Sequence, residues 1–421
     1  MDQKIRKNTK QLKLLEKNLS FSGLDSGTTF KKNASFPIHR WYSYVEGFSW
    51  NFVRKILQSY SKKDFIVLDP FCGSGTSLVE CCNLGIRSIG YDVNPFLTFV
   101  SDVKTDFSIN VKNIISEVEI LKSKFQNCNI TRDVRTFDKV NLSAYFANNN
   151  AFGKDVLPKV LFVKKCLNEI RDTKVRNFFI LAFCSIIIVV SNYRRGPDLA
   201  LKREKLKDFP VFERFLEQIS IMIEDLNKIK KSNFAKPKLY TGDSRFLEKI
   251  ENDSIDLVIT SPPYLNGTNY FRNTKLELWF TEMLTDVNEL HNYREKAITA
   301  GINDAFKSKY IETTIPNVKK VFDEISKSAY DSRIPIMVST YFEEISLCLQ
   351  NLFRGMKSDS KCYWVIGDSA FSKIHVPTDK LTVEVAEKNG FKHEITEIVR
   401  RRKSRSGFDL HEAVITLKKT D

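Results

Sequence analysis

The sequence lacks most of the features that mark a metal site, a disulfide framework or a membrane protein. Its 421 residues include 8 cysteines and 5 histidines, with no Cys-x-x-Cys pair and no His/Cys spacing typical of zinc ligands, so we expect no metal site. The longest apolar run, residues 178–190, is shorter than the roughly 20 residues that cross a bilayer, and it predicts a buried helix or strand. The segment MDQKIRKNTK leads into no apolar stretch of the kind found in secretory signals. We therefore expect a cytoplasmic protein with reduced thiols.

The sequence also offers few histidines that could act in catalysis. No carboxylate or cysteine stands at a spacing typical of catalysis from His39, His375, His393 or His411. We expect these four to be packing or surface residues. His39 is the exception to consider, because it lies in an aromatic segment beside a predicted cofactor site.

Acidic residues are outnumbered, 51 against 66 lysines and arginines, which gives a formal net charge of +15. A basic protein of this kind favours a polyanionic partner. The basic residues are interleaved with 32 phenylalanines and 14 tyrosines, which favours nucleic acid. A solvated basic surface explains the charge equally well, so charge alone leaves the partner open.

Hydrophobic periodicity predicts an α/β protein built on a Rossmann-like sheet. A strand at 65–68, a helix at 77–84 and a strand at 86–91 form one half of a doubly wound sheet. Later strands are predicted at 238–243, 255–259, 362–366, 394–399 and 412–417, with a helix at 381–388. Helical periodicity dominates the rest, so the predicted divisions are an N-terminal extension (1–35), core segments (36–105, 237–283 and 360–421) and two helical insertions (106–236 and 284–359).

A glycine turn, DPFCGSGT at residues 69–76, joins the first strand to the first helix. Such a turn brings the backbone and a helix N-terminus close to a ligand, but it lacks the third glycine of GxGxxG, which disfavours an NAD site. Asp69 suits a cationic ligand, and Asp92, after the second strand, is placed to accept both hydroxyls of a ribose. A cofactor with a ribose and a sulfonium group, S-adenosylmethionine, satisfies both acids. The competing interpretation is a tight turn with two strand-end caps.

A second turn, SPPY at residues 261–264, follows the strand at 255–259. Pro262 and Pro263 remove two backbone donors and fix a rigid turn whose carbonyl oxygens no local N–H can claim. Ser261 adds an acceptor and Tyr264 a flat stacking face, which together suit a planar base with an exocyclic amine. Hydrogen bonds from that amine would draw its lone pair out of the ring, so that it can attack a sulfonium methyl. A duplex base must be flipped out to reach such a pocket. An ordinary Pro-Pro loop is the alternative.

Together these motifs resemble the amino-methylating DNA methyltransferases. DPFCGSGT, GYDVNPF (90–96), TGDSRF (241–246), DLVITSPPY (256–264) and GDS (367–369) carry the resemblance, which covers the α/β core and is weak over the insertions. It implies a class I methyltransferase sheet and S-adenosylmethionine as cofactor. The implied cofactor-binding residues are Asp69, Pro70, Phe71, Gly73, Gly75, Thr76, Asp92, Asn94, Asp243, His39 and Trp41. The implied catalytic residues are Ser261, Pro262, Pro263 and Tyr264.

The resemblance also implies a substrate and a setting. Serine at the first position of the catalytic turn is typical of the cytosine-N4 branch, whereas Asp or Asn is usual in the adenine-N6 branch. The partners would be double-stranded DNA with a flipped target base and a cognate restriction endonuclease, in restriction-modification or host defence. The glycine turn precedes the catalytic turn here, unlike in many SPPY enzymes, which leaves the target-recognition region unassigned; 106–236 is our first choice and 284–359 our second.

Two basic segments are candidates for phosphate binding, with a solvated hairpin tip as the alternative for each. The first lies in the insertion at 193–207, and the second is expected in the loop at 400–410 between the last two strands. The candidate DNA-binding residues are Arg194, Arg195, Lys202, Arg203, Arg401, Arg402 and Lys403.

Several other functions are disfavoured. Cytosine-C5 methylation needs a nucleophilic cysteine, usually after proline, and no Pro-Cys pair occurs. Zinc-dependent deamination needs a ligand set that is missing. Guanine-N2 tRNA methylases share a similar glycine turn but carry an acidic DPPY and a longer N-terminal part. Adenine-N6 methylation, and a non-catalytic DNA-binding protein on a methyltransferase scaffold, remain the alternatives.

Overall fold

A seven-stranded sheet forms the centre of the protein. The structure is a computed structural model, and it describes residues 20–21, 30–44, 47–60, 65–129, 146, 150–196, 198–229, 234–265, 268, 270–404 and 407–420. The strand order is β10-β11-β7-β6-β1-β2-β5. The strands are β1 (Ile66–Asp69), β2 (Arg87–Asp92), β5 (Lys238–Thr241), β6 (Ile255–Thr260), β7 (Met356–Gly367), β10 (Phe391–Lys403) and β11 (Asp409–Lys419). The predicted α/β class and Rossmann-like sheet are confirmed.

The pairing of the strands places a crevice at one edge of the sheet. β1 pairs in parallel with β2 on one side and β6 on the other, and β7 continues the parallel set beside β6. Within this sheet only β11 is reversed: it pairs antiparallel with β7 and with β10, so β10 runs in the same direction as β7. Because the chain leaves β1 in one direction and returns to its other side at β6, the carboxyl ends of these strands meet at a topological switch point, where open α/β sheets bind ligands.

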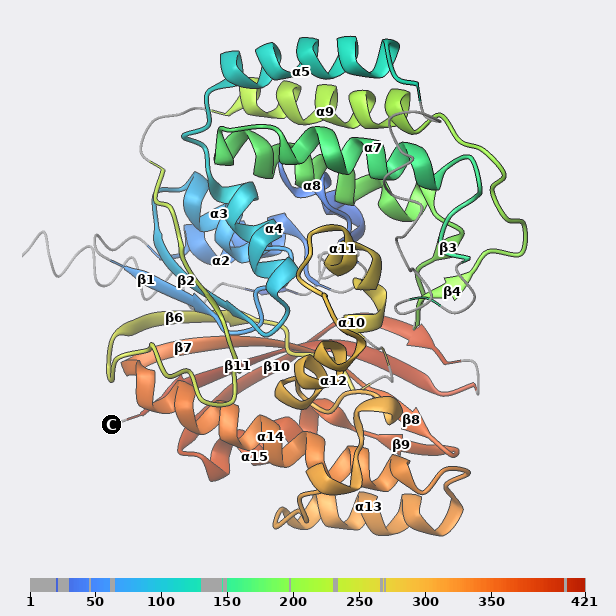
Figure 1. Ribbon diagram of the computed structural model, residues 1–421. Coiled ribbons are helices and arrows are strands. Elements are labelled where there is room, and N and C mark those ends of the chain that lie inside the picture. Colours follow the sequence, from blue (N-terminus) through green and yellow to red (C-terminus); the bar gives the residue numbers. More distant parts are fainter. Residues whose placement is uncertain are drawn as a thin grey trace, which may run out of the picture.

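Helices cover both faces of the sheet (Figure 1). On one face lie α2 (Trp50–Gln58), α3 (Thr76–Asn83) and α4 (Pro95–Thr105), and on the other α14 (Arg333–Gly355) and α15 (Thr378–Lys388). β7 alternates between them: Tyr363 packs in the core under α2, whereas Trp364 packs in the core under α14. This two-residue period is what a strand buried on both faces requires.

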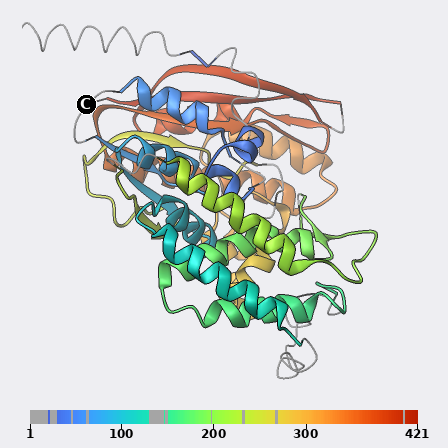
Figure 2. The same ribbon diagram turned by 90° about the horizontal axis from the view of Figure 1, so that it is seen from above.

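The first insertion forms a further helical layer over α4. It contains α5 (Val111–Gln126), α7 (Leu157–Asn168), α8 (Thr173–Val190) and α9 (Val211–Lys228), with a small hairpin of β3 (Tyr193–Arg194) and β4 (Ala200–Leu201). Figure 2 shows α5 and α9 side by side at the outer surface. The apolar run predicted at 178–190 is part of the longer helix α8, which packs against α4, α7, α9 and α11. In the described part of the chain it is the one helix long and apolar enough to cross a membrane, and it is 56% buried.

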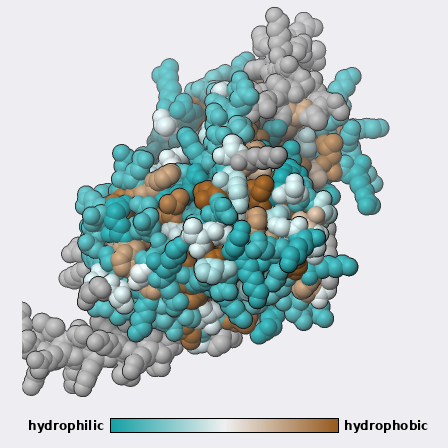
Figure 3. Space-filling view, turned by 90° about the horizontal axis from the view of Figure 1, so that it is seen from below, coloured by the Kyte–Doolittle hydropathy of each residue, from teal (hydrophilic) through white to brown (hydrophobic). Residues whose placement is uncertain are grey.

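The second insertion begins and ends earlier than the predicted 284–359. It contains α10 (Tyr270–Asn273), α11 (Lys275–Phe280), α12 (Val287–Lys296), α13 (Pro316–Ser328) and the short helices η6 (Ile302–Asp304) and η7 (Lys307–Lys309). The next helix, α14, packs on the sheet and runs directly into β7, so it belongs to the core and the boundary at 359 moves to before α14. The face seen from below is largely hydrophilic, with small hydrophobic patches (Figure 3).

Three smaller features complete the fold. η1 (Phe30–Ser35) and η2 (His39–Trp41) precede α2, and a hairpin of β8 (Ser369–Phe371) and β9 (Ile374–Val376) follows β7. Of the predicted N-terminal extension, Phe21 is described and is buried against Phe52 and Tyr363; most of it lies outside the described residues. The predicted basic loop at 400–410 is wrong at its start, because Arg400 to Lys403 pair with β11 and extend β10.

Candidate active site

A pocket lies at the switch point, where the two turns predicted from the sequence come together. The glycine turn forms one wall and the SPPY turn another. The pocket is lined by Tyr44, Gly47, Phe48, Asp69, Phe71, Cys72, Gly73, Ser74, Thr76, Asp92, Val93, Asn94, Leu97, Asp243, Ser244, Ser261, Pro262, Pro263, Tyr264, Tyr270, Phe271, Lys296, Ala297, Ile298 and Asp304. Of the predicted cofactor and catalytic residues, only Pro70, Gly75, His39 and Trp41 are outside this lining.

The glycine turn depends on both glycines. Gly73 and Gly75 have φ angles of 50° and 80°, the left-handed region that side chains disfavour. Gly75 precedes α3, and a Cβ there would lie 2.6 Å from Ser101 Oγ, which donates to the Gly73 carbonyl at 3.0 Å. Lys104, fully buried in α4, donates to the Ser74 carbonyl at 2.8 Å, and burial lowers its pKa to about 7. Buried side chains therefore hold the turn from behind.

Replacing Gly75 with alanine should distort this turn. The left-handed backbone costs about 1–2 kcal/mol for a residue with a side chain, and the new methyl must also displace Ser101. We expect a lower melting temperature and weaker S-adenosylmethionine binding, measured by thermal unfolding and calorimetry. Gly196→Ala is the matched control, since the nearest atom to its added Cβ is 3.5 Å away. Equal affinity in both variants would show that Gly75 does not shape the cofactor site.

Asp92 and Asp69 are the acids of the pocket. Asp92 accepts hydrogen bonds from the backbone N–H of Asn94 at 2.8 Å and of Gly73 at 3.0 Å. Asp69 accepts from the Thr260 hydroxyl at 2.8 Å and from Ser77, which ties β1 to β6 and α3. Burial raises the pKa of Asp92 to about 7 and that of Asp69 to about 6, and the hydrogen bonds only partly offset this.

These acids fit S-adenosylmethionine. Among the described residues neither carboxylate has a lysine or arginine partner, so the pocket holds two acids, Asp69 buried and Asp92 half-buried, without a counter-charge. A sulfonium would supply that charge, and each oxygen of Asp92 retains a lone pair for a ribose hydroxyl. The residues that would hold the cofactor are thus on the glycine turn and at the end of β2.

The predicted catalytic turn follows β6 and is held by two tyrosines and a glycine. Tyr341 donates to the Pro263 carbonyl at 3.1 Å, and the N–H of Tyr264 donates to Tyr270 Oη at 3.2 Å. The Tyr264 ring packs on Gly367, where an added Cβ would lie 3.1 Å from Cδ2. Within the described chain the hydroxyl of Ser261 accepts no hydrogen bond, so this acceptor remains available to a ligand.

One wall of the pocket was not predicted. It is the segment from Lys296 to Asp304, after α12, together with Tyr44, Phe48, Tyr270 and Phe271. Glu344 of α14 accepts from the N–H of Thr299 at 2.6 Å, and Asp304 accepts from Arg294 Nε at 2.8 Å. These buried charges fix the segment against the core. No motif in the sequence marks it, because its place depends on a distant glutamate.

His39 and Trp41 are not at the pocket, which corrects the role that the resemblance implied. His39 is fully buried, with Nε2 2.9 Å from Glu80, and burial lowers its pKa. Trp41 donates to Asp225 of α9 at 3.0 Å. Both tie the segment before α2 to the helices beside it. Pro70 is also set back, and its carbonyl accepts from Ser244.

Two other predicted cofactor residues line the pocket but are already engaged. Asp243 accepts two bonds from Arg245 Nε at 2.9 Å and forms an ion pair with its Nη2. The Asn94 side chain caps α4 by accepting from Phe96 N at 3.1 Å and donates to Thr274 at 2.8 Å. A ligand could therefore bind only the lone pairs on the Asp243 and Asn94 oxygens that these contacts leave unused.

The expectation that the histidines lack carboxylate partners is wrong for three of them. Besides the His39–Glu80 pair, His375 and His411 both contact Asp368. Only His393 has no such partner among the described residues, and it bonds the Thr396 hydroxyl at 2.9 Å. Sequence spacing could not reveal these contacts, since the partners lie on different strands and helices.

The predicted DNA-binding residues divide into buried and exposed sets. Arg195 donates to the Ser43 carbonyl at 2.8 Å and pairs with buried Glu277, and Lys202 donates to the carbonyls that end α8. These two are structural, which corrects their assignment. Arg402 is half-buried and donates to the Asp368 carbonyl at 3.2 Å. The exposed members are Arg194, Arg203, Arg401 and Lys403.

Comparison with known proteins agrees with this site. A family model described as DNA methylase matches residues 4–98. The type II methyltransferase M.BsoBI of Geobacillus stearothermophilus is 26% identical, over 90% of this chain and 83% of that protein. M.AvaI of Nostoc sp. is 25% identical, over 86% and 81% of the two chains, and M.MvaI of Kocuria varians 25%, over 77% and 75%.

The solved structures are more distant. An S-adenosylmethionine-dependent methyltransferase from Methanosarcina mazei matches 87% of this chain and 97% of its own, at 9% identity and a TM-score of 0.31. The chain is thus similar to type II methyltransferases and to a DNA methylase family, and its glycine turn and switch-point pocket fit S-adenosylmethionine as the cofactor.

Proposed function

We propose that the protein transfers a methyl group from S-adenosylmethionine to the exocyclic N4 amine of a cytosine in double-stranded DNA. The observation that carries this is the SPPY turn, which faces the same pocket as Asp92 and the glycine turn and leaves the Ser261 hydroxyl without a partner among the residues that the structure describes. A neutral hydroxyl can accept a hydrogen bond from the amine at little desolvation cost. Serine at this position supports cytosine N4 over adenine N6.

In this proposal the chain positions and polarises the amine. Ser261 and the Pro262 carbonyl accept its two hydrogens, and the Tyr264 ring stacks on the base. The bound cofactor supplies an electrophilic methyl on a sulfonium. Transfer would form the N–CH₃ bond as the S–CH₃ bond broke, and one amine hydrogen would leave as a proton to water. Tyr341, Tyr270 and Gly367 hold the turn rigid for this step.

The pocket's depth favours a flipped base. Ser261 and Tyr264 lie beside buried residues of the core rather than on a protruding surface, so a stacked base could not reach them. We place the activity in the cytoplasm, as the modification half of a restriction-modification or host-defence system with a cognate restriction endonuclease.

The exposed end of the β10–β11 hairpin is the proposed phosphate contact. Because Arg402 donates to Asp368, the variant to use is Arg401→Ala with Lys403→Ala, which removes only exposed charges. We expect weaker DNA binding, unchanged sequence preference and a salt dependence flatter by about one to two units of slope. Lys320→Ala with Lys327→Ala on α13 removes the same charge on an outer helix and is the control. A wild-type slope for the hairpin variant would mean that the hairpin is merely solvated.

Methyl transfer to purified nucleic acids tests the proposal directly. Labelled S-adenosylmethionine is incubated with the protein and either genomic DNA from a host without it or bulk tRNA. We expect label in DNA and none in tRNA. Label only in tRNA would favour a guanine-N2 enzyme, and no transfer with no saturable cofactor binding would favour a non-catalytic DNA-binding protein.

A further inference from the structure

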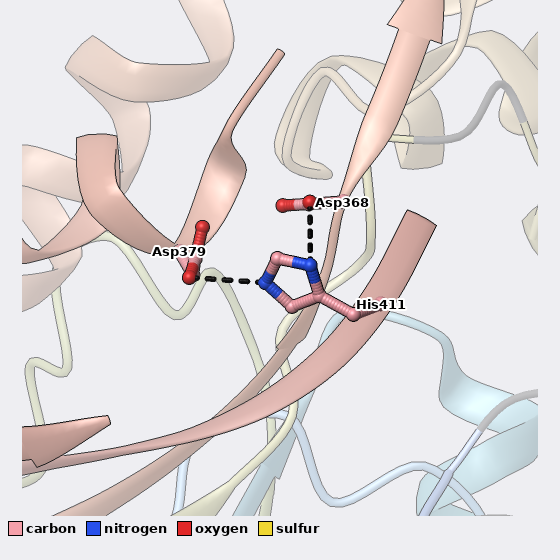
Figure 4. Close-up of side chains that lie close together, drawn as sticks. All are labelled: Asp368, Asp379 and His411. Atoms are coloured by element: carbon pink, nitrogen blue, oxygen red, sulfur yellow. Dashed lines mark hydrogen bonds and ion pairs between the residues drawn. The ribbon is translucent and has the colours of Figure 1, made fainter. Parts of the chain in front are cut away.

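Behind the catalytic turn, two aspartates and two histidines form a cluster in which only His375 is exposed. Asp368 follows β7, His375 lies on β9, Asp379 is in the first turn of α15 and His411 is on β11. Figure 4 shows the His411 ring between the two carboxylates. Its Nδ1 is 2.9 Å from Asp368 and its Nε2 is 3.1 Å from Asp379. His375 Nε2 lies 2.9 Å from the same Asp368 oxygen.

Both contacts bear on the hydrogens carried by the His411 ring. A neutral imidazole donates a hydrogen bond through one nitrogen only, so against two ionised carboxylates both contacts are hydrogen bonds only if both nitrogens carry hydrogen. The ring is then a cation between two carboxylates, of which Asp368 is wholly buried and Asp379 is 7% exposed. Such a bridge offsets the cost of burying the two negative charges. Two further charged groups lie close: the guanidinium of Arg402 donates to the Asp368 backbone carbonyl at 3.2 Å, and Glu412, next to His411, pairs with Arg400 at 3.1 Å.

A metal ion is the competing occupant. Asp368, Asp379 and His411 are residue types that bind metals, and Oδ1 of each aspartate is buried without a partner among the described residues. A coordinating nitrogen, however, carries no hydrogen. Because both nitrogens of His411 face carboxylate oxygens at hydrogen-bond distance, the geometry favours a protonated ring over a ligand.

The cluster is directly connected to the catalytic turn. Asp368 lies between Gly367, which packs against the Tyr264 ring, and Ser369, whose hydroxyl donates to the Leu265 carbonyl. The N–H of Asp368 also donates to the His411 carbonyl at 2.8 Å. Movement of Asp368 would therefore shift the backbone that supports Tyr264.

We propose that His411 is a positioning residue for methyl transfer: as an imidazolium it clamps Asp368 to Asp379 and so holds the backbone on which the Tyr264 ring rests. This inference rests on the proposed function, since it assigns the effect of His411 to the target-base side of the site. It predicts that the charge and the two donors matter, rather than the imidazole itself.

Three variants test the clamp: His411→Gln, His411→Arg and the control His393→Gln, whose histidine bonds only a threonine hydroxyl. We expect His411→Gln to lower kcat about 10- to 100-fold, the scale of a small misplacement in a catalytic site, with little change in S-adenosylmethionine affinity. His411→Arg keeps the charge and donates to both carboxylates, and it should restore kcat to within about threefold of wild type. His393→Gln should match wild type in both quantities.

Nitrogen NMR of the wild-type imidazoles separates this inference from the proposed function, because it needs no methyl transfer. We expect the His411 signals, assigned by their loss in His411→Gln, to show both nitrogens protonated at neutral pH. A neutral ring would overturn the inference, as would an arginine variant no more active than the glutamine variant. A wild-type protein that holds one Zn²⁺ and loses activity in EDTA would also overturn it, because a metal ion rather than a protonated imidazole would then link Asp368 to Asp379.

Discussion

Replacing Ser261 with alanine is expected to cut turnover by about 10- to 1000-fold while leaving S-adenosylmethionine affinity nearly unchanged, as loss of one transition-state hydrogen bond does. The Ser261 hydroxyl has no partner in the described chain, so its removal leaves no buried donor unsatisfied and should not unfold the protein. Its only expected loss is the bond to the target amine. Turnover is measured by methyl transfer to DNA, and affinity by calorimetry.

Tyr264 provides the companion substitutions for the same turn. Tyr264→Ala should cost at least as much as Ser261→Ala, since a flipped base loses a stacking partner worth about 1–3 kcal/mol. Tyr264→Phe keeps the ring that packs on Gly367 and should stay close to wild type. Ser328→Ala, at an exposed position that ends α13, is the control for Ser261. A fully active Ser261→Ala protein would contradict the assignment of this turn as the catalytic centre.

Replacing Asp92 with alanine is expected to weaken S-adenosylmethionine binding by about 1.5–3 kcal/mol, the scale of hydrogen bonds to a charged group. Asp92 is half-buried in the pocket wall and accepts from the N–H of Gly73, so the substitution removes a contact to the cofactor and a support of the glycine turn together. Asp155→Ala, at an exposed position before α7, is the control. Unchanged affinity by calorimetry would show that the acid does not contact the cofactor.

The raised pKa of Asp92 adds a pH dependence with a defined sign. Because the ribose and sulfonium favour the ionised acid, affinity should fall as the pH drops below about 7, by about tenfold between pH 8 and pH 6. Stability of the free protein should change in the opposite direction. The folded state retains a proton that the unfolded state releases, so the free energy of unfolding should decrease as the pH rises from about 4 to about 7. Asp92→Asn should flatten both curves.

The sequence predicts the parts of the fold that are locally defined. β1, β2 and β6 are short strand patterns that stop at Asp69, Asp92 and the SPPY turn. Both the strands and the site at their carboxyl ends can therefore be predicted from the sequence. Gly73 and Gly75 mark the turn because only glycine adopts its φ angles readily.

Features that depend on distant partners could not be predicted. The periodicity of α14 shows a helix but not the sheet beneath it, so it was assigned to an insertion. Arg400 to Lys403 read as a loop because they are basic, yet pairing with β11 extends the strand through them. Arg195 resembles a phosphate ligand until the structure places Glu277 beside it. The His411 cluster forms only because β11 pairs with β7 and brings its residues to Asp368.

Nucleoside mass spectrometry of DNA from a host that expresses the protein tests the central claim most directly. Wild-type protein should produce N4-methylcytosine, and Tyr264→Ala, expressed at the same level, should produce little or none. N6-methyladenine instead would keep the SPPY turn as the catalytic centre but overturn the assignment to cytosine. A methyl group on cytosine C5, or equal N4 methylation by wild type and Tyr264→Ala, would contradict the account of this turn as the site where an exocyclic amine is methylated.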